Sequence, residues 1–236
     1  MKTIRGKKGP FKERPYYTQD EIEEICTNEL KKAGLYPPAP APIRIDRFIE
    51  KRFHVSPVYE DGLPVGILAL TCFGPRGVQE IVVSKSAVEE GNLASERRLS
   101  STLAHEAGHG LLHGHLFALE GQSVLPLGEL VDGDQVKVLC RDDSIGSQGD
   151  SGYNGRWWEY QANRAIGSLL MPRRLVHEAI RPLLSTRGTL GRFVLPEEQR
   201  GEATRSLAGT FEVNHVVARI RIAELYPADV EGQLTL

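Results

Sequence analysis

The residues best suited to chemistry lie in one short stretch, His105-Glu106-Ala107-Gly108-His109. Two histidines four residues apart share one face of a helix, so both imidazoles can bind a single Zn²⁺ ion. The glutamate between them can then take a proton from the zinc-bound water, whose pKa the metal lowers to about 7. The spacing therefore predicts His105 and His109 as metal ligands and Glu106 as the general base.

A catalytic zinc ion normally has three protein ligands, and the sequence offers two candidates for the third. His115 stands ten residues after His105, but Leu112 occupies the position where a glycine would turn the chain back toward the metal. Glu159 lies in a second predicted helix, where its carboxylate would be costly to bury among apolar and aromatic neighbours without a cation. We therefore expect Glu159 to complete a His₂Glu site, with His115 as the alternative.

Three further residues are candidates to line the cleft or to stabilise the oxyanion formed in hydrolysis: Tyr153, Tyr160 and His113. His113 lies one helical turn beyond His109, so it can flank the metal without sharing it. A solvated helix end is the other interpretation of His113. Cys140 follows a predicted strand, and its thiolate could reach the metal. An ordinary buried thiol is the favoured interpretation of Cys140.

Helices must position these residues, and the sequence predicts several. Apolar residues at helical spacing indicate helices between Thr18 and Gly34, over Ile45–Phe53, from Ser95 or Ser100 through the HExxH stretch, and from Trp157 to the residue before Pro172. Gly110, Gly114 and Gly121 are expected to weaken the far end of the HExxH helix.

A small sheet is expected to support the HExxH helix. The segments Val65–Phe73 and Val78–Ser84 flank a Gly-Pro-Arg-Gly turn and predict an antiparallel hairpin, and Gln135–Leu139 predicts another strand. The expected fold class is therefore α+β. A small, mainly antiparallel sheet packs against the HExxH zinc helix, with N-terminal helices and a helical C-terminal part.

The C-terminal part has the proportions of a helix-turn-helix, with helices predicted over Glu197–Phe211 and Asn214–Leu225. Asn214 is placed to cap the second helix, which carries Arg219 and Arg221. Much of that helix is nevertheless expected to pack, through Val213, Val216, Val217 and Ile220. We therefore expect a packing subdomain that helps to dock a protein substrate, and no direct DNA binding.

Composition excludes several classes of protein. The 236 residues carry 29 Lys and Arg against 31 Asp and Glu, so a general nucleic-acid coat is not expected. The longest apolar run, Val65–Phe73, is far shorter than the ~20 residues of a membrane span, and no secretory signal follows the basic N-terminus. Three widely spaced cysteines favour a reducing, cytoplasmic location. Nothing in the sequence indicates an oligomeric state.

The segment Leu103–His113, together with Glu159-x-x-Ala162-Asn163 and Leu169-Leu170-Met171-Pro172, resembles the two zinc helices of the ImmA/IrrE metallopeptidases. The resemblance extends over roughly residues 16–226, although the stretch between His109 and Glu159 is longer than in many members. It implies that His105, His109 and Glu159 bind one Zn²⁺ per chain and that Glu106 is the base.

The resemblance also implies a substrate class and a domain organisation. Family members cleave helix-turn-helix transcriptional repressors in stress responses or in mobile-element control. Three parts are expected: a flexible basic tail over residues 1–15, a zincin-like metallopeptidase domain over 16–185, and a C-terminal helical subdomain over 186–236. The alternative function is a non-catalytic, zinc-containing regulator that binds a repressor or DNA through its C-terminal helices.

Overall fold

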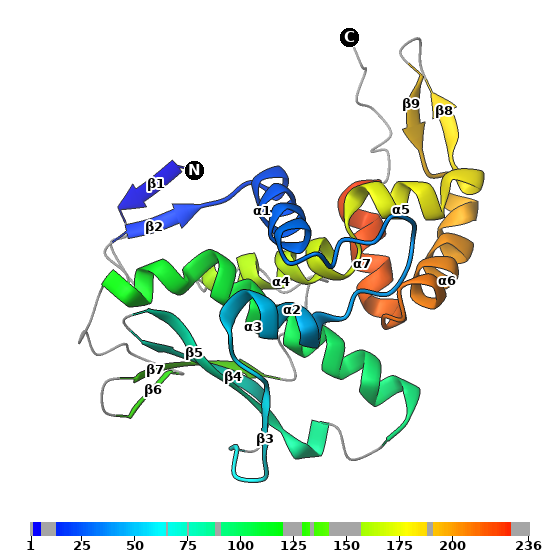
Figure 1. Ribbon diagram of the computed structural model, residues 1–236. Helices are drawn as coiled ribbons and strands as arrows, with labels where there is room; N and C mark the ends of the chain where they lie inside the picture. The colour runs from blue at the N-terminus through cyan, green and yellow to red at the C-terminus, as the bar shows by residue number, and fades with distance from the viewer. Residues whose placement is uncertain are drawn as a thin grey trace.

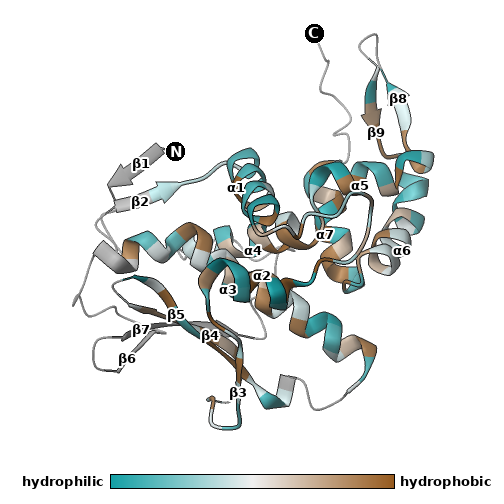
Figure 2. Cartoon of the chain, viewed as in Figure 1, coloured by the Kyte–Doolittle hydropathy of each residue, from teal (hydrophilic) through white to brown (hydrophobic). Residues whose placement is uncertain are grey.

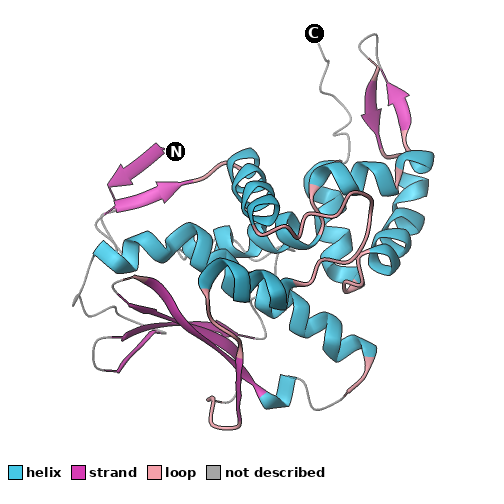
Figure 3. Cartoon of the chain, viewed as in Figure 1, coloured by secondary structure: helices cyan, strands magenta, loops and turns pink. Residues whose placement is uncertain are grey.

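The computed structural model describes residues 2–5, 13–64, 66–74, 76–87, 91–119, 129–132, 135–141, 157–187 and 191–227. The protein is α+β, with a small mixed sheet on one side of a larger layer of helices (Figures 1 and 3). One helix, α3 (Leu93–Leu119), crosses the sheet, and most of the remaining helices lie on the side of α3 away from the sheet (Figure 1).

The sheet has the strand order β3-β5-β4-β7-β6. Its strands are β3 (Val58–Glu60), β4 (Ile67–Gly74), β5 (Gly77–Ser84), β6 (Glu129–Asp132) and β7 (Gln135–Arg141). β3 runs parallel to β5, and the other three pairings are antiparallel. The predicted hairpin and the third predicted strand are confirmed.

Strand β4 is buried on both faces, and its successive side chains point alternately to one face and to the other. Leu70 and Cys72 pack with Val82 on the face away from α3. Ala69 and Phe73 pack with residues of the helices on the opposite face. A polar residue between these two positions is therefore directed at α3.

Helix α3 begins earlier than the sequence indicated. Its first turn is capped by Asn92, whose side-chain oxygen accepts from the Ser95 amide at 2.9 Å, while the Ser95 hydroxyl accepts from the Asn92 amide at 3.1 Å. This reciprocal pair satisfies two amides that the start of a helix leaves free, so the helix starts at Leu93 rather than at Ser95 or Ser100.

Helix α3 continues through Gly110 and Gly114, two of the glycines that were expected to weaken its far end. A Cβ atom at Gly110 would lie 2.6 Å from the Phe53 ring and 2.9 Å from Val78. The missing side chain thus permits close packing, and burial outweighs the low helix propensity of glycine. Gly121 lies outside the described residues.

Six other helices lie within the described residues, and five of them match helices predicted from the sequence. They are α1 (Gln19–Lys32), α2 (Ile45–Phe53), α4 (Trp157–Leu170), α5 (Arg173–Ala179), α6 (Arg200–Thr210) and α7 (His215–Leu225), with short 3₁₀ turns at Lys85–Ala87, Arg181–Leu183 and Glu197–Gln199. Thr18 and Glu21 form a full capping box at the start of α1, and Gly34 follows its end with φ +67°. Apolar residues line the sides on which these helices meet (Figure 2).

The C-terminal helices belong to the same core as the rest of the chain. One continuous apolar cluster contains Phe48 of α2, Ala107 of α3, Leu169 of α4 and Ile222 of α7. Asn214 occupies the N-cap position of α7 but makes no capping side-chain hydrogen bond there. Val216 is 41% exposed, unlike the packing residue that was expected, and Arg221 is fully buried. Arg221 is therefore not available to contact DNA.

The basic N-terminal segment contains two short paired strands. Strand β1 (Lys2–Arg5) pairs antiparallel with β2 (Glu13–Tyr16), and Pro15 is buried. A second two-stranded hairpin, β8 (Ser185–Arg187) with β9 (Arg192–Val194), precedes α6. Among the described helices, none combines the length and apolarity needed to cross a bilayer.

Candidate metal centre

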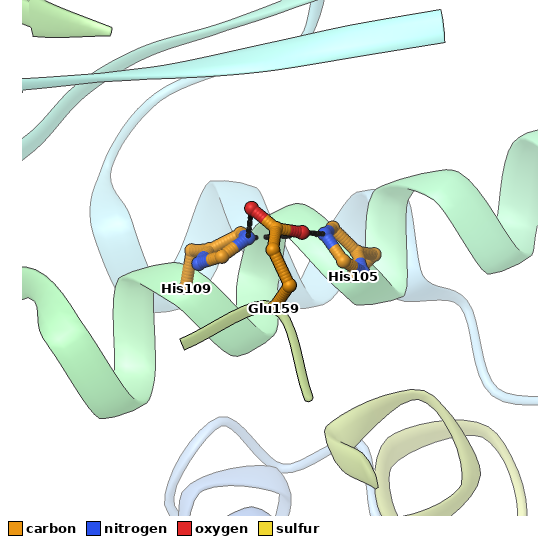
Figure 4. A group of neighbouring side chains, drawn as sticks. All are labelled: His105, His109 and Glu159. Atoms are coloured by element: carbon orange, nitrogen blue, oxygen red, sulfur yellow. Dashed lines mark hydrogen bonds and ion pairs between the residues drawn. The ribbon is translucent and has the colours of Figure 1, made fainter. Parts of the chain in front are cut away.

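Three predicted ligands converge between α3 and α4 (Figure 4). The Nε2 atoms of His105 and His109 lie 3.0 Å apart. Glu159 places Oε2 3.1 Å from His105 Nε2 and Oε1 3.6 Å from His109 Nε2. One ligand atom from each residue lies within 4.8 Å of the other two. We call these three residues the metal cluster, a possible metal-binding triad.

The close approach of α4 to α3 brings Glu159 to the two histidines. Gly108 lies between them in the chain, and a Cβ atom there would lie 2.8 Å from the Cβ of Ala165 and 3.1 Å from the carbonyl oxygen of Ala162. Small residues on both helices therefore set a short separation. A larger residue at position 108 would push α4, and Glu159 with it, away from the histidines.

Each histidine of the metal cluster has a partner for its outer nitrogen. His105 Nδ1 lies 2.9 Å from Asn163 Oδ1, and His109 Nδ1 lies 3.1 Å from His113 Nδ1. An amide oxygen only accepts, so His105 Nδ1 carries the proton and donates it. In the neutral ring, Nε2 then presents a lone pair to the other members of the metal cluster. Metal-binding histidines typically have such outer partners, which fix the tautomer and ring orientation.

The electrostatics of the metal cluster favour a cation. Burial alone would raise the pKa of Glu159, but His109 and the hydrogen bonds from both histidines lower it well below its usual range. An ionised Glu159 carboxylate therefore lies 3.1 Å from His105 Nε2. A proton can bridge only one such contact, whereas a metal ion satisfies all three ligands at once.

Glu106 lies beside the metal cluster and is fully buried. Its Oε2 accepts a hydrogen bond from the Thr71 hydroxyl of β4. Its Oε1 has no hydrogen-bond partner within the part of the chain that the structure describes. Burial raises the pKa of Glu106, and His105, His109 and the Thr71 hydroxyl act in the opposite direction. A buried carboxylate with one free oxygen suits a group that holds a water molecule or a second ligand.

The two remaining histidines of α3, His113 and His115, differ in burial. His113 is fully buried, so the interpretation as a solvated helix end is wrong for it. Burial and the neighbouring His109 lower the pKa of His113 to about 3, so its ring is neutral. His113 contacts the nitrogen of His109 that points away from the metal cluster, which does not favour a role in oxyanion stabilisation. His115 is exposed and is not part of the metal cluster.

The other candidates are less closely tied to the metal cluster. Tyr160 is 47% exposed, and its hydroxyl accepts from Arg164 Nη2 at 2.7 Å. Tyr153 lies outside the described residues. Cys140 pairs with Ala69 across β7 and β4, and its side chain lies outside the described part of the structure.

Sequence reasoning did not single out Thr71, and it assigned no role to Asn163 or Gln161. Gln161 Oε1 lies 3.0 Å from His113 Nε2, and its amide donates to the Pro15 carbonyl at 3.0 Å. A hydroxyl residue in an otherwise apolar strand was the only available signal for Thr71. Amides two and four residues after a ligand were the signal for Gln161 and Asn163.

No family model matches the chain, and a search of curated proteins gave no match. The function proposed below therefore depends on the geometry of the site and on the motifs.

Proposed function

We propose that the chain is a zinc-dependent endopeptidase of the ImmA/IrrE type. The observation that carries the proposal is the convergence of two imidazole nitrogens and an ionised carboxylate beside Glu106. Glu106 is a second, buried carboxylate, and one of its oxygens has no partner among the described residues. Glu159 and an ionised Glu106 together carry two negative charges, which a divalent cation offsets. Two histidines and a glutamate form the ligand set of catalytic zinc sites that keep a fourth position open.

The residues beside the metal cluster supply the acid–base chemistry. When bound, a zinc ion would polarise the scissile carbonyl and lower the pKa of the attacking water toward 7. Glu106 accepts the proton of that water through its free Oε1 and then donates it to the departing amine. Thr71 holds the other carboxylate oxygen of Glu106, so the base has one defined orientation.

The substrate class follows from the family resemblance. We propose a helix-turn-helix transcriptional repressor as the substrate, cleaved in the cytoplasm. Burying the Glu106 carboxylate costs free energy, because the charge is removed from water. A non-catalytic regulator has no use for this carboxylate that would explain the cost.

The variant Glu106→Gln tests the proposal. The amide preserves size but cannot take up a proton at neutral pH. Zinc content should stay at one ion per chain, while cleavage should fall by about 10²- to 10⁴-fold. The assay is co-expression with the helix-turn-helix repressor encoded nearest to the gene, read on a gel, with elemental analysis of the purified protein.

Two outcomes would contradict this assignment. Wild-type rates of cleavage by zinc-loaded Glu106→Gln would show that another residue is the base. An intact repressor that co-purifies with zinc-loaded wild-type protein would favour the non-catalytic regulator. If the proposal holds, Glu106→Gln should retain the uncleaved repressor in a pull-down.

A further inference from the structure

A chain of hydrogen bonds leads from the metal cluster to the N-terminal strand. His109 Nδ1 lies 3.1 Å from His113 Nδ1, and His113 Nε2 lies 3.0 Å from Gln161 Oε1. The Gln161 amide nitrogen donates to the Pro15 carbonyl at 3.0 Å. His109, His113 and Gln161 are buried, as is Pro15 of β2. We call these four residues the relay.

The far end of the relay determines the direction of every bond in it. A backbone carbonyl only accepts, so Gln161 must direct its NH₂ group at Pro15 and its oxygen at His113. The oxygen in turn requires a proton on His113 Nε2. In a neutral ring, His113 Nδ1 is then an acceptor, so His109 Nδ1 must donate. His109 Nε2 is left with its lone pair directed at the metal cluster, as a ligand requires.

Without the Pro15 carbonyl, this order is lost. Gln161 could rotate its amide and present its NH₂ group to His113 Nε2, which would move the His113 proton to Nδ1. His109 would then accept at Nδ1 and carry its proton on Nε2, the tautomer that cannot bind a metal. The contact with Pro15 is the one fixed reference, because each of the other three side chains can reverse its polarity.

We propose that the N-terminal strand β2 is a working part of the metal centre: through the Pro15 carbonyl, Gln161 and His113, it holds His109 in the tautomer that binds the metal. Gln161 and His113 are thus positioning residues that touch neither metal nor substrate. This inference rests on the metal site of the proposed function but not on peptide cleavage.

The coupling acts in both directions. If docking of β2 favours metal binding, then metal binding must favour docking of β2 by the same factor. Backbone amides of residues 13–18 should therefore exchange with solvent more slowly in zinc-loaded than in metal-free protein. This measurement uses the full, unmodified chain and no variant.

Two substitutions of Gln161 distinguish its contact with His113 from its contact with Pro15. Gln161→Met removes both hydrogen bonds at similar side-chain length and should raise the Kd for Zn²⁺ about 10- to 100-fold, the usual effect of losing an outer partner of a ligand. Gln161→Glu offers His113 an acceptor but sets a carboxylate against the Pro15 carbonyl. It should keep a Kd close to that of the wild type while abolishing the effect of zinc on exchange of residues 13–18.

A matched pair on α3 controls for changes in folding. His113→Phe keeps a ring against Trp157, where the His113 and Trp157 ring centroids are 5.5 Å apart, yet removes both nitrogens. It should weaken zinc binding as Gln161→Met does, whereas His115→Phe, at the exposed position two residues further on, should not. The Kd values come from competition between the full-length protein and a chromophoric chelator for Zn²⁺.

The outcomes distinguish this inference from the proposed function. Wild-type Kd values in Gln161→Met and His113→Phe, or equal exchange of residues 13–18 with and without zinc, would overturn the relay while leaving the metal site in place. A wild-type protein that binds no zinc would overturn both. Weak zinc binding by Gln161→Glu as well as Gln161→Met would show that an acceptor for His113 does not preserve the affinity, and would overturn the relay.

Discussion

Two groups of charged or polar side chains are buried among the helices, and they differ in how their charges are matched. The first is the metal cluster with Glu106. The second, which we call the arginine cluster, joins α1, α4 and α7 and consists of Glu23, Arg164, Arg221 and Glu224. Two arginines and two glutamates leave the arginine cluster neutral. The metal cluster with Glu106 carries two carboxylates and no permanent cation.

Hydrogen bonding separates the two groups in the same way. The Arg221 guanidinium donates to Glu23, to Glu224 at 3.3 Å and to the Met171 carbonyl at 3.0 Å. The second oxygen of Glu23 accepts from the Arg173 amide at 2.6 Å. In contrast, Glu106 Oε1 has no hydrogen-bond partner among the described residues. The carboxylates of the arginine cluster thus have cationic partners within the chain, although Arg164 Nε makes no hydrogen bond among the described residues, whereas Glu106 has a hydroxyl partner alone.

The largest expected effect is the loss of metal from the metal cluster. His105→Ala, His109→Ala and Glu159→Ala should each lower the zinc content from one ion per chain to near zero, because two remaining ligands hold zinc poorly. His115→Ala should leave it unchanged. Elemental analysis of the purified variants measures both. If His115→Ala loses zinc and Glu159→Ala keeps it, the third ligand has been assigned wrongly.

The arginine cluster should respond in the opposite way. Arg221→Met leaves Glu23 buried without its cation and Glu224 paired with Arg164 alone, and should lower the free energy of unfolding by about 3–5 kcal/mol. The folded variant should still bind one zinc ion. Arg219→Met, at an exposed position of α7, should change stability by less than ~0.5 kcal/mol. Urea unfolding measures both, and zinc loss from folded Arg221→Met would show that the two groups are coupled.

The stability of metal-free protein should reveal the unmatched charge of Glu106. Burial raises the pKa of Glu106 above 4.5, so ionisation disfavours the folded state. Its contribution is most favourable below pH 4.5 and is lost as the pH rises through the folded-state pKa. At pH 7.5, metal-free Glu106→Gln should exceed the wild type in unfolding free energy by ~1–3 kcal/mol.

This difference should shrink as the pH falls toward 4.5, where the wild-type carboxyl becomes protonated. Denaturant titrations of chelator-treated proteins across this pH range provide the measurement. A difference independent of pH would mean that packing, and not charge, distinguishes the two side chains.

The smallest expected effect concerns Thr71. Thr71→Val removes the hydroxyl that donates to Glu106 at nearly constant volume, and should cost about 1 kcal/mol of unfolding free energy in zinc-loaded protein. Thr102→Val is the matched control, because the Thr102 hydroxyl is buried and makes no hydrogen bond within the described residues. That substitution should be neutral or stabilising. Equal losses in the two variants would mean that the hydrogen bond to Glu106 contributes nothing.

Features encoded over a few residues were predictable. The capping box of α1, the hairpin of β4 and β5, and the spacing of His105 and His109 all depend on positions close in the chain. Glu159 lies on a different helix from the two histidines, but it was still predicted as a ligand, because a carboxylate on an apolar helix requires a cation. Its convergence with the two histidines agrees with that argument.

Features that depend on distant pairs were not predictable. Thr71 meets Glu106 across 35 residues, Gln161 meets Pro15 across 146, and Arg221 meets Glu23 across 198. The burial of His113 was missed for the same reason, since a helix pattern does not say what covers its last turns. The N-terminal strand β2 likewise depends on contacts with residues far along the chain, such as Gln161.

The sequence by itself determined which residues can bind a metal and which helices carry them, because ligand spacing and helix periodicity are local properties. Tertiary structure alone decided which buried charges are matched. It brings arginines to Glu23 and Glu224, and it brings Thr71 and the histidines to Glu106 and Glu159, with no lysine or arginine among their partners in the described residues. The reason is physical: the free energy of a buried charge depends on what surrounds it in space, and residues far apart in the chain supply those surroundings.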